Sequence, residues 1–200
     1  METIKSAIAV QPTLCTERLI LRPFSLADAP NVQRLAGEWD IAARTLVIPH
    51  PYPDGLAEQW IRSHPQDFAA GNAVNFAITL IDNTLCGAIG LGLVAENQLA
   101  ELGYWIGKPY WGNGYCTEAA RALLKFGFLN LGLNRIQATH YSDNPASGRV
   151  MQKIGMTHEG RRRQHTFRWG EFKDIELYGI LKQDWLGDSQ NRPNAPGQLY

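Results

Sequence analysis

The chain has 200 residues, of which 44% are hydrophobic and 19% are charged, a composition typical of a globular protein with one hydrophobic core. Nineteen Lys and Arg residues balance nineteen Asp and Glu residues, so no overall charge would attract nucleic acid or an anionic membrane. Three cysteines, Cys15, Cys86 and Cys116, lie far apart, which argues against a disulfide framework and a zinc site and fits a reducing compartment.

No apolar stretch approaches the ~20 residues that a membrane-spanning helix needs. The first residues, METIKSAIAVQPT, hold only a short apolar run, so no signal peptide is predicted and we expect a cytoplasmic protein without a membrane partner. One domain is predicted over residues 1–186. Residues 187–200 are expected to form a flexible tail because they lack apolar periodicity.

The first half of the chain predicts a strand, two helices and three further strands. Residues 18–24 alternate as in a strand, and Ser25 is a candidate N-cap for a helix to about Gly37. The proline-rich segment 49–53 is expected to be stiff and extended, and Asp54 to cap the second helix. The three strands are predicted at 75–81, 85–95 and 99–107, with a turn at Asp82–Asn83.

The second half predicts a long apolar-striped helix that begins between Gly114 and Thr117. A strand at 135–141 follows, and then a helix that has Asn144 as N-cap and Pro145 in its first turn. The last two strands are predicted near residues 157–163 and 173–181. This order indicates one α+β domain, a mixed sheet with helices on its faces.

The loop YWGNGYCT, residues 110–117, carries Gly112 and Gly114 between a predicted strand and a predicted helix. The N–H groups of a first helical turn lack intrahelical partners and attract anions, and glycine leaves them accessible. The same glycines also suit a tight turn without a ligand, so the loop alone leaves both interpretations open. It matches neither a Walker loop nor a dinucleotide fingerprint.

The element order also predicts that the strand ending at Gly107 splays from the strand at 135–141. The exposed backbone beside the loop would then bond an extended amide chain, with Asn144 and Ser147 on the far side. Coenzyme A, which has a pyrophosphate head and an amide-bearing arm, fits such a cleft.

Six segments in order resemble the GNAT superfamily of acetyl-CoA-dependent N-acetyltransferases, in particular the branch of ribosomal-protein N-terminal (alanine or serine) acetyltransferases. They are TERLILRPF, PHPYP, GLGLV, AELGYWIGKPYWGNGYCTEA, NPASGRVMQKIGMTHEG and DIELYGIL, and they span about residues 16–185. The resemblance implies a single GNAT-type domain with a mostly antiparallel mixed sheet. It also implies direct acetyl transfer from acetyl-CoA, without a metal, to a protein N-terminus or to a small amine metabolite or antibiotic.

The resemblance implies that the backbone of one loop binds the pyrophosphate, namely Trp111, Gly112, Asn113, Gly114, Tyr115 and Cys116. The pantetheine arm is expected to pair with the main chain near Ile106 and to contact Asn144. Two residues depart from the common pattern: Trp111 stands where many members have Gln or Arg, and Cys116 where Ala or Gly is usual. A thiol at a helix N-terminus can act as a nucleophile, but we prefer to interpret Cys116 as a small apolar residue beside the cofactor.

Glu101 is the candidate general base, because acetyl transfer needs a proton taken from the ammonium group. It lies mid-strand on the face opposite Leu102, and the alternative is a carboxylate in a surface ion pair. The resemblance implies that Ser147 protonates the departing thiolate, with Tyr141 as the alternative acid.

Arg161, Arg162 and Arg163, with His165, Arg168 and Trp169 nearby, form the main local basic cluster. Such a run can bind RNA or a ribosomal surface, or it can be the solvated edge of a strand. A CoA-binding or RNA-docking module with little catalysis therefore remains an alternative to an enzyme. The oligomeric state is open, with a homodimer among the alternatives.

Overall fold

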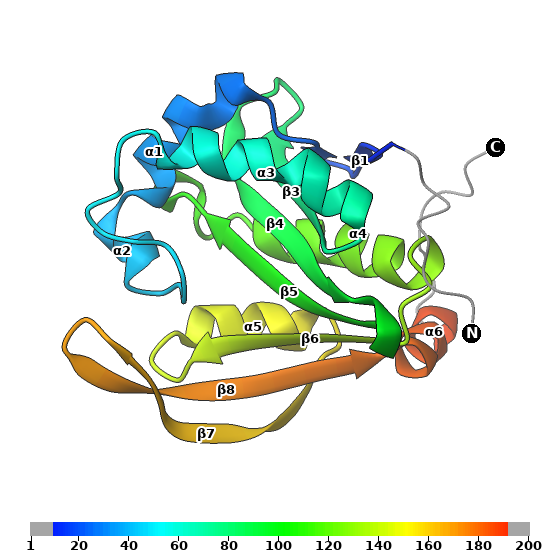
Figure 1. Cartoon of the computed structure of the whole chain (residues 1–200). Coiled ribbons are helices and arrows are strands. Elements are labelled where there is room, and N and C mark those ends of the chain that lie inside the picture. Colours follow the sequence, from blue (N-terminus) through cyan, green and yellow to red (C-terminus); the bar gives the residue numbers. More distant parts are fainter. Residues whose placement is uncertain (1–9, 192–200) are drawn as a thin grey trace.

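The computed structural model describes the backbone of residues 10–191 and the side chains up to Gly187. A single eight-stranded sheet, in the order β1-β2-β3-β4-β5-β6-β8-β7, runs through the molecule (Figure 1). Its neighbouring strands are antiparallel except for β5 and β6, which are parallel. The predicted mixed, mostly antiparallel sheet is confirmed.

The strands are β1 (Leu14–Cys15), β2 (Leu19–Arg22), β3 (Ala73–Leu80), β4 (Leu85–Val94), β5 (Leu99–Ile106), β6 (Arg135–Tyr141), β7 (Thr157–Arg168) and β8 (Glu171–Leu181). The helices are α1 (Ala29–Ala36), α2 (Trp39–Ala42), α3 (Leu56–Ala70), α4 (Tyr115–Leu129), α5 (Pro145–Lys153) and α6 (Lys182–Asn191). Among residues 10–191, no helix is long and apolar enough to cross a membrane.

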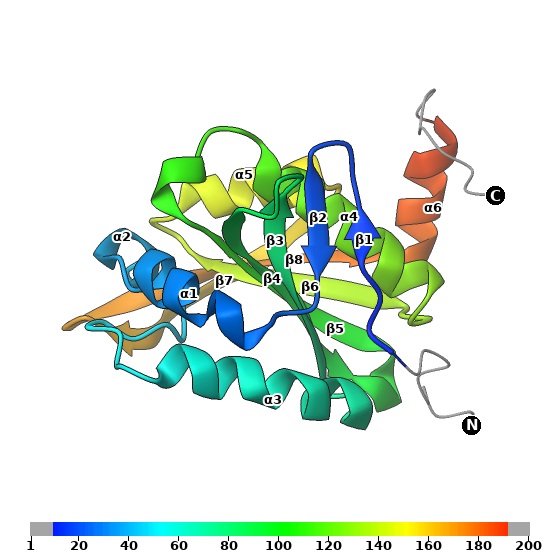
Figure 2. The ribbon, with the colours of Figure 1, turned by 90° about the horizontal axis from the view of Figure 1, so that it is seen from above.

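Helices cover both faces of the sheet, with α1 and α3 on one face and α4 and α5 on the other (Figure 2). On α4, Leu123, Leu124 and Phe128 follow helical spacing, and all three are fully buried against the sheet. On α1, Val32 and Leu35 are buried in the same way on the opposite face. Each sheet face therefore receives an apolar helix stripe, as the predicted two-sided arrangement requires.

Several predicted details need correction. The predicted helix after Ser25 is split into a 3-10 turn, Leu26–Asp28, and α1, because the Asp28 carboxylate accepts the Ser25 N–H at 2.8 Å and closes a capping box. Asp54 does not cap α3: the N-cap is Gly55, and the Asp54 carboxylate accepts a bond from Gln33 instead. The short elements β1 and α2 were not predicted, since two and four residues carry too little periodicity.

The predicted tail begins as a helix. Helix α6 runs to Asn191, past the expected start of the tail at residue 187, and Trp185 anchors it by packing its ring 5.5 Å from that of Phe128. Residues 192–200 lie outside the described residues, so the tail beyond Asn191 and the domain limits of 1–186 stay predictions.

Strands β5 and β6 part early, and this opening positions the site. Their parallel pairing covers Leu99–Glu101 against Arg135–Gln137 and goes no further along either strand. The predicted splay is therefore present, but it starts after Glu101 and not after Gly107. The remaining residues of β5, up to Ile106, border the gap.

Candidate active site

The loop between β5 and α4 has open space above its glycines. Gly112 and Gly114 have φ angles of +79° and +78°, a region that favours glycine, and a Cβ on Gly112 would touch nothing within 4 Å. Gly114 is the N-cap of α4 and provides no side-chain cap. In the part of the chain that the structure describes, no backbone acceptor bonds the N–H groups of Tyr115, Cys116 and Thr117. The loop thus fits an anion that approaches the helix N-terminus.

Arg18 fastens this loop and forms an ion pair with Glu118 beside it. Its Nη1 donates to the Asn113 carbonyl at 3.0 Å, and its Nε donates to Glu118 Oε2 at 2.7 Å. Its Nη2 lies 3.6 Å from where a Cβ on Gly114 would be, and its guanidinium carbon lies 5.1 Å from the centre of the Tyr115 ring. Sequence reasoning missed Arg18 because it comes from the turn before β2, almost a hundred residues earlier.

Cys116 packs against the main apolar cluster. Burial raises the pKa of its thiol to about 12, so the helix N-terminus does not produce a reactive thiolate here. This favours the interpretation as a small apolar residue beside the cofactor over the interpretation as a nucleophile.

The cleft side of β5 offers main-chain groups to an extended ligand. The Gly107 N–H donates to Cys86 on β4, so by strand alternation Tyr104 and Ile106 direct their main-chain groups toward β6, from which β5 has already separated. The Trp111 indole Nε1 donates to the Ile106 carbonyl and thereby holds the loop against the end of β5. The Ile106 N–H and both main-chain groups of Tyr104 face the gap.

Ser147 and Asn144 lie across that gap at the start of α5. Asn144 is the N-cap, as predicted: its Oδ1 accepts the Ser147 N–H at 3.4 Å, and its Nδ2 donates to the Arg44 carbonyl at 3.5 Å. The hydroxyl of Ser147 lies 2.8 Å from the phenol oxygen of Tyr104. Burial raises the pKa of Tyr104, which keeps the phenol protonated. Tyr104, which sequence reasoning missed, thus brings β5 and α5 together at the predicted acid.

Glu101 and Ser147 approach the gap from different faces of the sheet. Glu101 is exposed at the point where the splay begins, and its Oε1 accepts the Thr139 hydroxyl of β6 at 3.4 Å. Odd and even residues of β5 face opposite ways, so Glu101 lies on the α1 side while Tyr104 reaches Ser147 on the α5 side. The structure places the two predicted catalytic residues on the two sides of one opening.

Tyr141, the alternative acid, points away from Ser147. Its neighbour His140 faces α5, where a Cβ on Gly148 would lie 2.8 Å from the His140 ring, so alternation turns the Tyr141 phenol to the other face of β6. Among the described side chains, the hydroxyl of Tyr141 has no hydrogen-bond partner.

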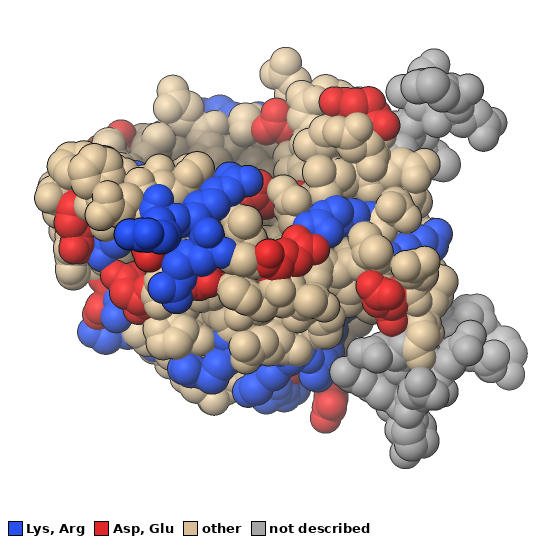
Figure 3. All heavy atoms as spheres, turned by 90° about the horizontal axis from the view of Figure 1, so that it is seen from below, with Lys and Arg blue, Asp and Glu red and all other residues tan. Residues whose placement is uncertain are grey.

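The basic run on β7 is partly neutralised. Arg161 pairs with Glu176 at 2.6 Å and lies 3.7 Å from Asp174. Burial raises the pKa of Glu176, but hydrogen bonds from Ser142, His158 and Arg161 outweigh it and hold that pKa at about 2. Seen from below, Lys and Arg side chains lie over the β7–β8 hairpin, with acidic side chains among them (Figure 3). The interleaved charges fit a solvated strand edge better than a nucleic-acid surface.

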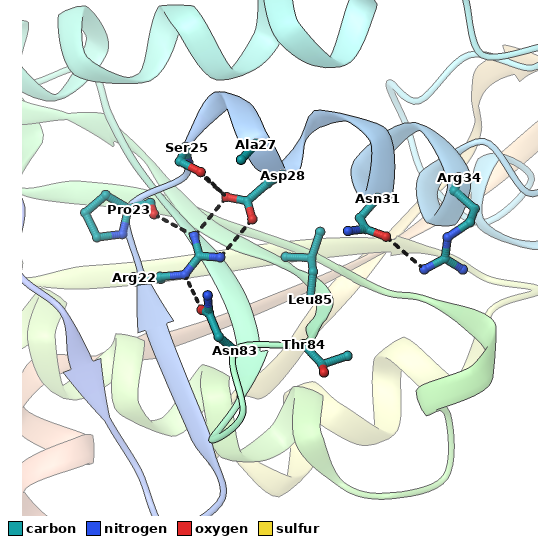
Figure 4. A pocket seen from close by; sticks show the side chains of 10 residues that line it. All are labelled: Arg22, Pro23, Ser25, Ala27, Asp28, Asn31, Arg34, Asn83, Thr84 and Leu85. Carbon is teal, nitrogen blue, oxygen red and sulfur yellow. Dashed lines mark hydrogen bonds and ion pairs between the residues drawn. The ribbon is translucent and has the colours of Figure 1, made fainter.

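A hollow of about 570 Å³ lies elsewhere, between β2, the β3–β4 turn and α1 (Figure 4). The partly buried Arg22–Asp28 ion pair, at 2.8 Å, forms part of its wall, and none of the predicted site residues lines it. Within residues 10–191, no group of three or more His, Cys, Asp or Glu side chains could hold a metal ion.

The fold is that of a class of acetyltransferases, one of whose solved structures superposes on most of this chain. Residues 18–157 match the family described as "Acetyltransferase (GNAT) domain". The chain belongs to this family, and it is an acetyl-CoA-dependent N-acetyltransferase.

Individual relatives are also named as acetyltransferases. The chain is 34% identical over 159 residues to the Bacillus subtilis protein named "Putative ribosomal N-acetyltransferase YdaF", covering 79% of this chain and 84% of the relative. It is 30% identical over 101 residues to the ribosomal-protein-serine acetyltransferase of Escherichia coli, covering 50% and 56%. A GNAT acetyltransferase structure from Bacillus anthracis superposes with a TM-score of 0.76 at 29% identity, covering 86% of this chain and 99% of that one.

Proposed function

We propose that this enzyme transfers the acetyl group of acetyl-CoA directly to the α-amino group of a polypeptide N-terminus. The observation that carries the proposal is the gap between β5 and β6, with the anion-binding loop at one end and Glu101 at the other. Similarity to relatives named for ribosomal-protein substrates supports this acceptor. The absence of disulfides among the described cysteines supports our expectation of a cytoplasmic enzyme.

The cofactor is proposed to lie along the gap. The backbone from Trp111 to Cys116, with Arg18 beside it, binds the pyrophosphate. The main-chain groups of Tyr104 and Ile106 pair with the amides of the pantetheine arm, and Asn144 borders the arm on the far side. This path leads the thioester into the opening between β5 and β6, which Glu101 and Ser147 face from either side.

The reaction is a balanced acyl transfer. Glu101 takes a proton from the ammonium group, directly or through a water, and the freed amine nitrogen attacks the thioester carbonyl carbon. The tetrahedral intermediate collapses as the C–S bond breaks, and Ser147 gives its proton to the thiolate. Tyr104, hydrogen-bonded to Ser147, returns a proton to the serine. The second proton that the nitrogen loses on collapse reaches the phenol through water, and Glu101 releases the first to solvent. The products are the N-acetylated amine and free CoA.

The test is a CoA-release screen across N-terminal peptides and small amines, with products identified by mass spectrometry. We expect acetylated peptides at the α-amino group, and in Glu101→Gln a fall in kcat of at least about 100-fold with unchanged CoA affinity. Glu96→Gln, at an exposed carboxylate just before β5, is the matched control and should keep full turnover. Acetylation of small amines alone would favour the metabolite alternative, and CoA binding without turnover would favour the non-catalytic one.

A further inference from the structure

Tyr141 is a buried donor without an acceptor. The residue is 1% exposed, yet its hydroxyl bonds to nothing among the described side chains. It lies two residues beyond Thr139 on the same face of β6, about 7 Å along the strand, and Thr139 bonds to Glu101. A buried polar group left unpaired is unfavourable, so this phenol is suited to an acceptor that arrives with a ligand at the same face as the proposed base.

Two further unpaired donors lie at the end of the neighbouring β7–β8 hairpin. The Nε of Arg168 and the Nε1 of Trp169 are buried atoms that have no partner within the part of the chain described. The guanidinium carbon of Arg168 lies 4.8 Å from the centre of the Trp169 ring. Burial raises the pKa of Tyr141, and the positive charges of Arg168 and Lys173 oppose that rise. Arg168 therefore links the other two donors, because its charge acts on the Tyr141 phenol and its guanidinium lies over the Trp169 ring.

The backbone at this point is also unusual. Trp169 and Gly170 form the two-residue turn between β7 and β8, with φ angles of +56° and +83°. Asn, Asp or Gly usually occupies such a turn, and a bulky residue in the left-handed region is disfavoured by about 1–2 kcal/mol. Strained residues of this kind occur preferentially at functional sites.

Contacts hold the tip of this hairpin under α2. The rings of Trp169 and Trp39 lie 4.8 Å apart, edge to face, and Arg168 donates through Nη2 to the Ile48 carbonyl. Figure 1 shows the tip beside α2 and the loop that follows it. Arg168 and Trp169 are therefore held against α2 and the loop after it, and they are not on a free arm.

We propose that Tyr141, Arg168 and Trp169 form an acceptor subsite that binds a carbonyl or carboxylate oxygen next to the amine to be acetylated. This inference rests on the proposed acetyl transfer and adds the substrate class to it. An α-amino group of a peptide or an amino acid brings such an oxygen with it. A polyamine brings only donors and positive charge, so it would leave three donors unpaired and would face Arg168.

Acceptor preference tests the subsite in the wild-type enzyme. CoA release is measured with a tetrapeptide amide that has a free N-terminal alanine, with free alanine, and with 1,4-diaminobutane. We expect kcat/KM for the tetrapeptide amide or for alanine to exceed that for the diamine by about 100-fold, the equivalent of two hydrogen bonds. The ratio between the first two identifies the bound oxygen as a peptide carbonyl or as a free carboxylate.

Single-donor variants test the residues themselves. Tyr141→Phe and Trp169→Phe each remove one donor while keeping an aromatic ring, and each should raise KM for the preferred acceptor about 5- to 10-fold. KM for acetyl-CoA and the weak activity on the diamine should stay unchanged. This pattern would not result if the two residues had a merely structural role. Arg162→Gln, at an exposed cation on β7, is the control and should match the wild type.

The subsite and the transfer reaction can fail separately. A preference for the diamine, or an unchanged acceptor KM in both variants, overturns the subsite while leaving acetyl transfer in place. If no acceptor is turned over, calorimetric titration of the tetrapeptide amide into CoA-loaded protein decides. Peptide binding that Tyr141→Phe weakens supports the subsite even then, and no peptide binding overturns it; CoA binding without any turnover counts against the transfer reaction itself.

Discussion

The phenol oxygen of Tyr104 lies 2.8 Å from the hydroxyl oxygen of Ser147 and 3.1 Å from its carbonyl oxygen. This contact joins β5 to α5 across the gap that opens after Glu101. Because the phenol is held protonated by burial, it can orient the serine hydroxyl and return the proton that the serine gives to the thiolate. The proposed acid is therefore a pair of residues.

Removing either member of this pair should give nearly the same defect. We expect Tyr104→Phe and Ser147→Ala each to lower kcat about 10- to 100-fold, with KM for acetyl-CoA changed less than about two-fold. The double variant should be little worse than either single one, because residues that act as a unit are not additive. Tyr178→Phe, which removes another buried phenol, one bonded to Gln152, is the control. Additive losses in the double variant would show that the two residues act independently.

Gly112 should be needed for the cofactor and not for the fold. An added methyl at Gly112 enters the space proposed for the pyrophosphate, so Gly112→Ala should raise KM for acetyl-CoA at least about 10-fold. Gly132, just after α4, has a φ of +69° and also has nothing within 4 Å of a Cβ. Gly132→Ala should therefore lower thermal stability to a similar extent, through the same backbone strain of about 1 kcal/mol, without changing KM. Equal KM values in the two variants would place the phosphate elsewhere.

Local patterns predicted the elements well, because helix stripes and strand alternation are properties of short segments. The strand at 135–141 and the Asn144 cap came from the sequence with their observed bounds. The point at which β5 and β6 separate was not predicted correctly, because it depends on pairing between segments more than thirty residues apart.

The same limit explains what was missed in the site. Arg18 reaches the loop from the far end of the chain, and Tyr104 gains its role from a contact with Ser147, 43 residues away. Tyr104 had one usable signal, since it lies two residues before Ile106 and so faces the same side of β5. The prediction that Asp54 caps α3 was wrong, because the neighbouring Gly55 adopts the left-handed conformation that starts this helix.

Cys116 should react slowly with a thiol reagent, and more slowly still when the cofactor is bound. With its pKa raised to about 12 by burial, its thiolate is a minor species at pH 8. Iodoacetamide should therefore modify the exposed Cys15 quickly and Cys116 slowly, as measured by peptide mass spectrometry. Saturating CoA should slow Cys116 further and leave Cys15 unchanged. If saturating CoA leaves the labelling rate of Cys116 unchanged, that result would argue against CoA binding at this loop.

His64 should make the fold sensitive to mild acid. Its ring lies 4.4 Å from the Trp60 ring and 5.4 Å from the Phe24 ring, and in the part of the chain described neither nitrogen has a hydrogen-bond partner. The residue is 5% exposed. Burial lowers its pKa from 6.5 to about 4, with the charge of Asp67 opposing. The folded protein therefore holds this imidazole neutral where the unfolded chain would protonate it.

The sign of the effect follows from proton uptake. Above pH 6.5 both states are neutral at His64, and its contribution does not change with pH. Between pH 6.5 and 4 the unfolded chain binds a proton that the folded protein excludes, so the free energy of unfolding should fall by roughly 3 kcal/mol. Urea unfolding at pH 7, 5.5 and 4.5 should show a shallower fall for His64→Phe, while His165→Gln, at an exposed histidine, should follow the wild type. A His64→Phe variant with the wild-type pH dependence would mean that acid acts on the fold through other groups.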